Sequence, residues 1–378
     1  MPYCHSPWTN LDIDPQGQMA PCCKFDYSQY NDNSLNINDN SINDYLNSKV
    51  LLQSKEEFKN NHWPAGCIRC KVEEESNVQS KRQLDYERWQ DQYDNYAKEQ
   101  KFITASVAFG NTCNLKCIIC GPGSSSKWHT EAQAITGITK KPNHFYKQNF
   151  VQDVIQNLPN LTHLDIPGGE PFLSGIKQQK ELLDYYIQSN QAKHISIHYT
   201  TNTQIYPDQS WWDLWEHFKE VDIQISVDGI ESRYEYIRFP GNWIAFEQNT
   251  KKYLEAAEQK DNIKLSVSHT LSAYNIYYLD EFFTWCQNIG LPRPWVGRIH
   301  RPEHMRASVF PQTIKQEIVA HLNTSNFNDV KTWANHLSVT DDSKYFDLFC
   351  NRKKLHDNYR SLSFDKTFPE VAELLANY

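Results

Sequence analysis

The chain has 378 residues, 39% of them hydrophobic, and carries a formal net charge of −8 at neutral pH. This length and apolar content allow one large domain or two smaller ones with cores of their own, and they exclude a disordered chain. The acidic balance argues against nucleic-acid binding, because a phosphate backbone is bound by clustered cations and the sequence has no basic stripe.

The sequence also lacks the signals of membrane insertion and secretion. Its apolar runs are shorter than the roughly 20 residues that cross a bilayer, and the N-terminus has no basic segment followed by an apolar one. We therefore expect a soluble, cytoplasmic protein that does not bind a membrane. Because a reducing compartment keeps thiols free, the ten cysteines are interpreted mainly as metal ligands and not as a disulfide framework.

Residues 1–100 differ in composition from the rest of the chain. They are rich in Asn, Asp and Gln, contain five cysteines and show little strand pattern. The polar stretch 28–43 predicts a long loop, and a polar helix is expected from about 77 to 100. Four aromatic residues recur on this helix at helical spacing as packing surface: Tyr86, Trp89, Tyr93 and Tyr96. We expect no large apolar core in this region, so something else must hold it together.

Four of these cysteines are candidate metal ligands: Cys4, Cys22, Cys67 and Cys70. The first two flank Gly17 in a C-x12-G-x4-C pattern, and the last two form a C-x2-C pair. Four thiolates close a metal site and stabilise a small fold by coordination. Spacing alone does not separate a Zn(Cys)4 site from an iron–sulfur cube, and on that basis zinc is favoured. Cys23 is an alternative ligand to its neighbour Cys22.

From residue 102 onward, short apolar strands alternate with amphipathic helices. We expect strands at 103–109, 163–166, 194–199, 221–227, 263–269 and 294–299. The helices expected between them include 175–189, 210–219, 245–258 and 277–287. This alternation predicts parallel strands with helical crossovers, which is an α/β fold. Helices without a readable motif follow, and we expect 351–378 to pack on the rest of this fold.

Cys113, Cys117 and Cys120 follow the first of these strands at C-x3-C-x2-C spacing. Three thiolates can hold three irons of a cubane cluster and leave the fourth iron open to an outside ligand. Structural zinc and electron-carrying cubes normally take four protein ligands instead. Parallel α/β sheets bind their ligands beyond the C-terminal ends of the strands. The three-cysteine sequence from Cys113 to Cys120 therefore indicates a catalytic cluster.

This run resembles the cluster loop of radical S-adenosylmethionine (radical SAM) enzymes. The resemblance implies a partial (β/α)6 TIM-like barrel whose three loop cysteines hold a catalytic 4Fe-4S cluster. In that family the open iron binds the amino and carboxylate groups of SAM. One electron from the cluster then splits SAM into methionine and a 5'-deoxyadenosyl radical, which takes a hydrogen atom from the substrate. Ile119 stands where the family usually has an aromatic residue, and its backbone is still expected to reach the adenine.

Further motifs at strand ends resemble the SAM-binding sequences of the family. Gly168, Gly169 and Glu170 match its GGEP motif, which binds the amino group of SAM. Asn202 follows the third expected strand, where the family often has a residue that lines the cofactor. A simple turn residue is the alternative for Asn202.

Ser226 and Asp228 belong to an S-x-D-G sequence that is followed by Arg238. The resemblance implies that Ser226 meets the SAM ribose and that Arg238 pairs with the SAM carboxylate. A guanidinium suits that carboxylate, because its planar fork donates two parallel hydrogen bonds. A surface arginine is the alternative for Arg238.

The N-terminal cysteine pattern also resembles a module of this family. C-x9–15-G-x4-C patterns open the auxiliary-cluster module called SPASM, whose shortened form with a single cluster is called a twitch domain. The resemblance favours a second 4Fe-4S cluster over zinc on the four N-terminal cysteines. Most relatives carry the module after the barrel, and here it precedes it. We expect a twitch-like domain at 1–100, a radical SAM core barrel at 101–310 and a C-terminal helical extension at 311–378.

The expected function is reductive cleavage of SAM and hydrogen abstraction from a substrate, with the auxiliary cluster accepting an electron. A peptide or protein side chain is the favoured substrate, because family members with such modules often modify ribosomally made peptides. A flavodoxin- or ferredoxin-like protein is the expected electron donor. Two alternatives stay open: radical modification of a small molecule such as a sugar, nucleoside or amino acid, and a non-catalytic zinc or iron–sulfur interaction protein.

Overall fold

The computed structural model describes residues 2–30, 35–75, 79–138 and 147–378, without the side chains of 88–96. The chain forms two compact units. The first unit comprises Met1–Thr112, Pro142–Thr200 and Pro207–Val221. The second unit comprises Cys113–Lys141, Thr201–Tyr206 and Asp222–Tyr378. In the described part of the chain, no helix is long and apolar enough to span a membrane.

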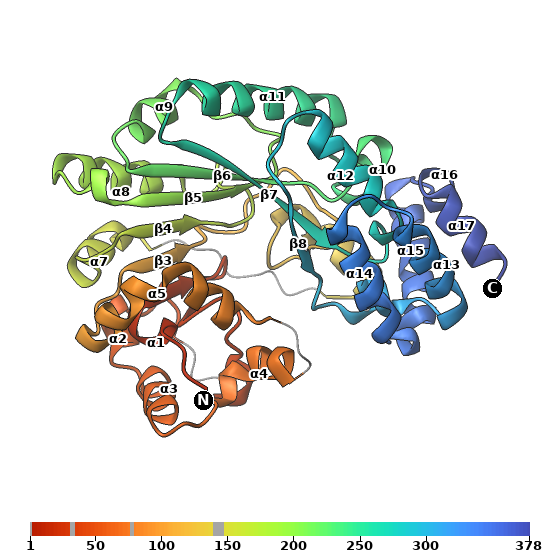
Figure 1. Ribbon diagram of the computed structural model, residues 1–378. Helices are drawn as coiled ribbons and strands as arrows, with labels where there is room; N and C mark the ends of the chain where they lie inside the picture. Colours follow the sequence, from red (N-terminus) through yellow and green to blue (C-terminus); the bar gives the residue numbers. More distant parts are fainter. Residues whose placement is uncertain (1, 31–34, 76–78, 139–146) are drawn as a thin grey trace. The chain divides into compact units, whose positions relative to one another are not determined.

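The described residues form an eight-stranded sheet in the order β2-β1-β3-β4-β5-β6-β7-β8 (Figure 1). The strands are β1 (Asn10–Ile13), β2 (Met19–Ala20), β3 (Thr104–Val107), β4 (His163–Ile166), β5 (Ser196–Thr201), β6 (Glu220–Ser226), β7 (Ile263–Leu271) and β8 (Trp295–Arg298). The pair β1–β2 is antiparallel, whereas β1–β3, β3–β4, β4–β5 and β7–β8 are parallel. The predicted α/β fold is confirmed, and β3 to β8 lie in chain order, as in a partial (β/α)6 barrel.

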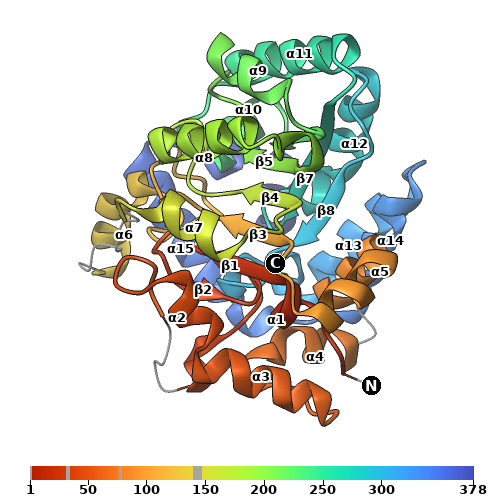
Figure 2. The same ribbon diagram turned by 90° about the vertical axis from the view of Figure 1, so that its left-hand side faces the viewer.

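Helices connect these strands, as the sequence predicts. They are α7 (Phe150–Asn157), α8 (Ile176–Gln188), α9 (Gln209–Trp215), α10 (Glu231–Ile237), α11 (Trp243–Gln259) and α12 (Leu279–Asn288). Figure 2 shows α7 and α8 over one face of the strands of the first unit. In β5, buried Ile197 and Tyr199 alternate with the half-buried, polar Ser196 and His198. The sheet of this unit therefore presents apolar side chains on one face and polar ones on the other.

The N-terminal region contradicts two expectations. It contains a strand, β1, whose residues pair in parallel with β3 from Asn10↔Thr104 to Ile13↔Val107. It also has an apolar core, to which Leu11, Met19 and Phe58 contribute fully or almost fully buried side chains. The sequence does not reveal the strand or the core, because each short element contributes too few apolar residues to show a hydrophobic periodicity. The short helices here are α1 (Ser6–Thr9), α2 (Ile42–Leu46), α3 (Lys49–Lys59) and α4 (Ile68–Glu75).

The predicted polar helix is α5 (Lys81–Glu99). Tyr86 is 37% exposed and stacks on the ring of His5, with 5.4 Å between the ring centroids. The side chains of Trp89, Tyr93 and Tyr96 lie outside the described ones.

Helices of the C-terminal part complete the second unit. They are α13 (Gln312–Asn323), α14 (Asn328–Val339), α15 (Phe346–Arg360), α16 (Phe364–Thr367) and α17 (Pro369–Ala376). Phe349 and Phe364 have no exposed surface and pack in one cluster with Tyr274 at the end of β7. Cys286 is 2% exposed in the same cluster, which confirms that it is a core residue. Cys350 is partly buried against this cluster.

Replacing Phe349 by Ala should lower the free energy of unfolding by about 3–5 kcal/mol, because the ring leaves a cavity between packed aromatic side chains. Urea unfolding monitored by circular dichroism measures the change. The matched control is Leu348→Ala on the same helix, because Leu348 is 42% exposed and should cost little. Equal effects of the two changes would contradict the packing described.

Candidate functional site

The three cysteines of the C-x3-C-x2-C run form a cluster of side chains in the second unit. Cys113 and Cys117 are buried, and Cys120 is half-buried. They pack with Leu115 and Ile119, so apolar side chains surround the thiols. The thiols of Cys117 and Cys120 lie within hydrogen-bond distance, and this bond lowers the pKa of Cys117 while burial opposes the effect.

The backbone of this loop is held by the segment around Arg238. The amide of Lys116 donates to the carbonyl of Phe239 at 2.7 Å, and the amide of Ile118 donates to the carbonyl of Ile237 at 2.7 Å. Because buried backbone groups need partners, these two bonds set the course of the loop between its cysteines. They also bring Arg238 to the cysteine loop, although more than 100 residues separate the two in sequence.

Arg238 is buried and paired with Asp228, with 2.6 Å between Nη2 and Oδ2. Burial disfavours its charge, but the carboxylate of Asp228 and the thiol of Cys117 outweigh this and raise the pKa of Arg238. Asp228 Oδ1 accepts a hydrogen bond from the amide of Thr270 at 2.8 Å. Arg238 is therefore not a surface residue. Its partner, Asp228, was also expected at the cofactor, but the sequence did not show that the two residues pair.

Asn202 also lies at the cysteine loop. Its Nδ2 is 3.7 Å from Cys113 Sγ and donates to Asn114 Oδ1 at 2.8 Å. Ser226 lies at the end of β6, with its Oγ 3.4 Å from Ser268 Oγ. The second unit therefore brings Asn202 and Arg238 together with the three thiols.

The Gly-Gly-Glu sequence lies in the first unit against the residues that precede Cys113. The amide of Gly169 donates to Gly110 O at 3.2 Å, and that of Glu170 donates to Thr112 O at 2.9 Å. A Cβ atom added at Gly169 would lie 2.4 Å from Thr112 O, so only glycine permits this approach. Glu170 is fully buried, and its Oε1 accepts a hydrogen bond from the amide of Phe172 at 3.3 Å.

The four N-terminal cysteines line one cavity in the first unit, and part of this cavity is open to solvent. Cys22 belongs to the lining residues, whereas its neighbour Cys23 does not. Gly66 lets the chain before Cys67 pack on Phe25, because a Cβ at Gly66 would lie 2.4 Å from that ring. Burial raises the pKa of the thiols of Cys4, Cys22 and Cys67.

Cations that sequence reasoning missed line the same cavity. Lys81 and Arg82, from the start of α5, are lining residues together with Lys24. Lys81 pairs with Asp85 at 2.8 Å, and Arg82 pairs with Glu74 at 2.6 Å. The sequence gives no signal for these cations, because they come close to the cysteines only when the chain folds.

The donor sets fit iron–sulfur clusters and SAM. Within the described ranges, no three His, Cys, Asp or Glu side chains converge to hold a single metal ion, whereas the thiols gather in two groups. Thiolates are the ligands that such clusters take. Arg238 Nε is buried without a hydrogen-bond partner among the described residues, which leaves a donor for the carboxylate of a ligand.

Two family models match the chain. The SPASM model, described as an iron-sulfur cluster-binding domain, matches residues 4–71. A model described as a 4Fe-4S single cluster domain matches residues 104–238. Together they cover the cysteines of both groups and the sequence up to Arg238.

Curated relatives match about half of the chain. A GTP 3',8-cyclase of Actinobacillus pleuropneumoniae serotype 3 (strain JL03) is 26% identical over 198 residues, which are 50% of this chain and 51% of the relative. The sporulation killing factor maturation protein SkfB of Bacillus subtilis (strain 168) is 24% identical over 195 residues, 50% of this chain and 40% of SkfB. The chain thus spans about half the length of the curated relatives it matches.

Solved structures show weaker similarity. Native anSMEcpe with bound AdoMet has a TM-score of 0.40 and 16% identity, with 52% of each chain covered. Streptococcus suis SuiB bound to S-adenosylmethionine has a TM-score of 0.36 and 14% identity, with 62% of this chain and 49% of SuiB covered.

Replacing Gly169 by Ala should reduce SAM binding at least tenfold, because the new methyl group would push the loop away from Thr112. Equilibrium dialysis of the anaerobically reconstituted protein with labelled SAM measures the affinity. The control is Gly290→Asn, at a left-handed residue (φ 79°) with open space around it, where Asn is tolerated. Unchanged SAM affinity in Gly169→Ala would contradict the expected role of Gly169 in SAM binding.

Proposed function

Because the chain belongs to the radical SAM family and carries a SPASM domain, we propose that it cleaves SAM reductively and removes a hydrogen atom from a substrate. Cys113, Cys117 and Cys120 would hold a 4Fe-4S cluster with one open iron. When bound, that cluster and SAM would supply an electron and a carbon-centred radical. The observation that carries the proposal is the grouping of these three buried or half-buried thiols with Asn202 and Arg238 in one unit.

The chain's own residues would orient SAM and exclude water. Arg238 would donate from Nε to the SAM carboxylate, while its pair with Asp228 fixes the orientation of the guanidinium. The backbone of Gly168 and Gly169, with Glu170, would bind the amino group. Asn202, Ser226 and the backbone of Ile119 would line the adenosine. The apolar side chains around the thiols would keep water from a reactive radical.

The N-terminal thiols would hold a second 4Fe-4S cluster, a group able to take up the electron that an oxidised substrate gives up. The lining of one cavity by all four of these cysteines supports this, because a cube of this kind takes four thiolates. A flavodoxin- or ferredoxin-like protein would supply electrons to the other cluster. Both clusters require a reducing compartment, and we infer the cytoplasm.

A peptide or protein side chain is the substrate we favour. The name of SkfB, a maturation protein for a killing factor, supports this class. A small molecule is the second candidate, because GTP 3',8-cyclases, which act on a nucleotide, match a similar share of this chain. A non-catalytic role is disfavoured, because the loop cysteines, Asn202 and Arg238 are kept together in a buried site.

Replacing Cys113, Cys117 and Cys120 together by Ala should abolish 5'-deoxyadenosine formation, because the cluster loses its protein ligands. The product is quantified by chromatography after anaerobic incubation with dithionite and SAM. The iron content should fall from about eight to about four atoms per chain. Cys286→Ala, in the apolar core, is the control that should change neither value. One zinc and no iron in the wild-type protein would contradict the proposal.

Replacing Cys67 and Cys70 by Ala should spare SAM cleavage but stop substrate turnover. The reason is that these thiols would hold only the cluster that takes up the substrate's electron. Both rates are measured on the same anaerobic sample. Substrate turnover at the wild-type rate in this variant would contradict the electron-accepting role of the N-terminal cluster. The proposal that the protein cleaves SAM would not be affected.

The substrate class is tested with two kinds of candidate under turnover conditions. Where a short peptide is encoded beside the gene, that peptide is the first candidate, and mass spectrometry should detect a change in its mass. The parallel incubation contains a set of nucleotides that includes GTP. A modified nucleotide together with an unmodified peptide would favour the small-molecule alternative.

A further inference from the structure

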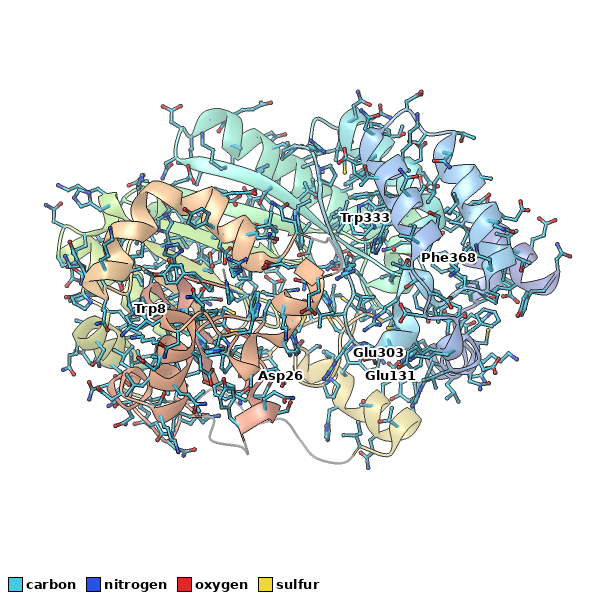
Figure 3. All side chains as sticks on the ribbon, turned by 60° about the horizontal axis from the view of Figure 1, so that its bottom comes forward. Trp8, Asp26, Glu131, Glu303, Trp333 and Phe368 are labelled. Carbon is cyan, nitrogen blue, oxygen red and sulfur yellow. The ribbon has the colours of Figure 1, made fainter. Side chains whose placement is uncertain are left out.

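A buried carboxylate links the cysteine loop to the C-terminal helices. Glu131, on α6 (His129–Thr136), has no exposed surface. Its Oε1 accepts a hydrogen bond from Arg360 Nε and lies within hydrogen-bond distance of His356 Nδ1, each at 2.8 Å. Its Oε2 lies 2.8 Å from Lys116 Nζ. Figure 3 shows Glu131 between α6 and the C-terminal helices. Three side chains, two from α15 and one from the cysteine loop, therefore converge on Glu131.

Arg360 also holds the loop directly. Its Nη2 donates to the carbonyl of Lys116 at 2.8 Å. Lys116 lies between Cys113 and Cys117, the first two cysteines of the loop. Trp128 Nε1 donates to the carbonyl of Cys117 at 2.8 Å, and the Arg360 guanidinium lies 5.1 Å from the centroid of that indole ring. The carbonyl of Lys116 is thus held by Arg360 itself, and the carbonyl of Cys117 is held by Trp128, which Arg360 contacts.

The charges of this network do not cancel. Burial disfavours the charge of Glu131, but His356, Lys116 and Arg360 outweigh it and lower the pKa of Glu131 to about 2. One carboxylate therefore stands against two permanent cations, Lys116 and Arg360, and a net positive charge remains beside the loop. A positive charge near an iron–sulfur cluster stabilises its reduced, more negative form.

We propose that Glu131 and Arg360 are positioning residues that hold the cysteine loop from the C-terminal helices and set the reduction potential of the cluster bound there. This inference rests on the proposed function, since it needs a cluster on Cys113, Cys117 and Cys120. It gives the C-terminal helices, in which the sequence shows no motif, a role at the site.

The test uses the full chain with Cys67 and Cys70 changed to Ala, so that one cluster gives the signal. Midpoint potentials are measured by redox titration followed by electron paramagnetic resonance, and iron release to a chelator is timed. Arg360→Met should shift the potential to more negative values and speed iron release roughly tenfold, the effect of losing a hydrogen bond to a charged group. Arg360→Lys keeps the charge, so the potential should stay near that of wild type while release still becomes faster.

Glu131→Gln supplies the decisive comparison, because it removes a negative charge while preserving shape. Its potential should shift to less negative values, opposite to Arg360→Met. The matched control is Arg352→Met on the same helix, whose Nη1 donates to Ile135 O at 3.0 Å on α6 and not to the loop. It should change neither potential nor iron release.

Equal potentials in all variants, or shifts of the same sign in Glu131→Gln and Arg360→Met, would overturn the proposal and leave a purely structural network. Should Arg360→Met fail to fold, the sign of the Glu131→Gln shift decides alone. Adding SAM to the protein with unchanged Glu131 and Arg360 separates this inference from the proposed function. A reducible cluster whose spectrum does not change with SAM contradicts the proposed function. The potentials of the variants still decide the role of Glu131 and Arg360. Absence of any cluster on the loop overturns both.

Discussion

The pairing of the cysteine loop with the segment around Arg238 is the interaction on which the site depends. A loop with three cysteines in eight residues has no regular structure of its own, so its backbone groups need partners from elsewhere. The amides of Lys116 and Ile118 find them in the carbonyls of Phe239 and Ile237. The same two bonds place Arg238 beside the thiols, and its pair with Asp228 holds the cation there.

The two groups of cysteines share one electrostatic arrangement. Each is surrounded by apolar side chains that raise the cost of charge, and each has cations from a helix that lies apart from it in sequence. At the N-terminal cavity the cations are Lys81 and Arg82 of α5, and at the loop Arg360 of α15 acts through Lys116. A buried thiolate is unfavourable without a cation or a hydrogen-bond donor nearby.

Sequence patterns predicted most of the strands and the crossover helices, because apolar periodicity is a local signal. Short motifs also named candidate site residues, and the roles of these residues stay predictions. Strand β1 was missed, since four residues are too short to show a period and its existence depends on pairing with β3. The apolar core of the N-terminal region was missed for the same reason. The pairing of Arg238 with Asp228 and the network around Glu131 could not be predicted, because a charged residue carries no mark in the sequence of the partner that folding gives it.

The central claim is that three thiolates leave one iron open and that SAM binds to it. Electron–nuclear double resonance on the reduced protein, with Cys67 and Cys70 changed to Ala and with SAM labelled with 15N in its amino group, tests this claim directly. We expect a hyperfine coupling between the labelled nitrogen and the cluster, which disappears when SAM is omitted. A cluster that shows no such coupling at saturating SAM, with all its irons held by protein side chains, would contradict it.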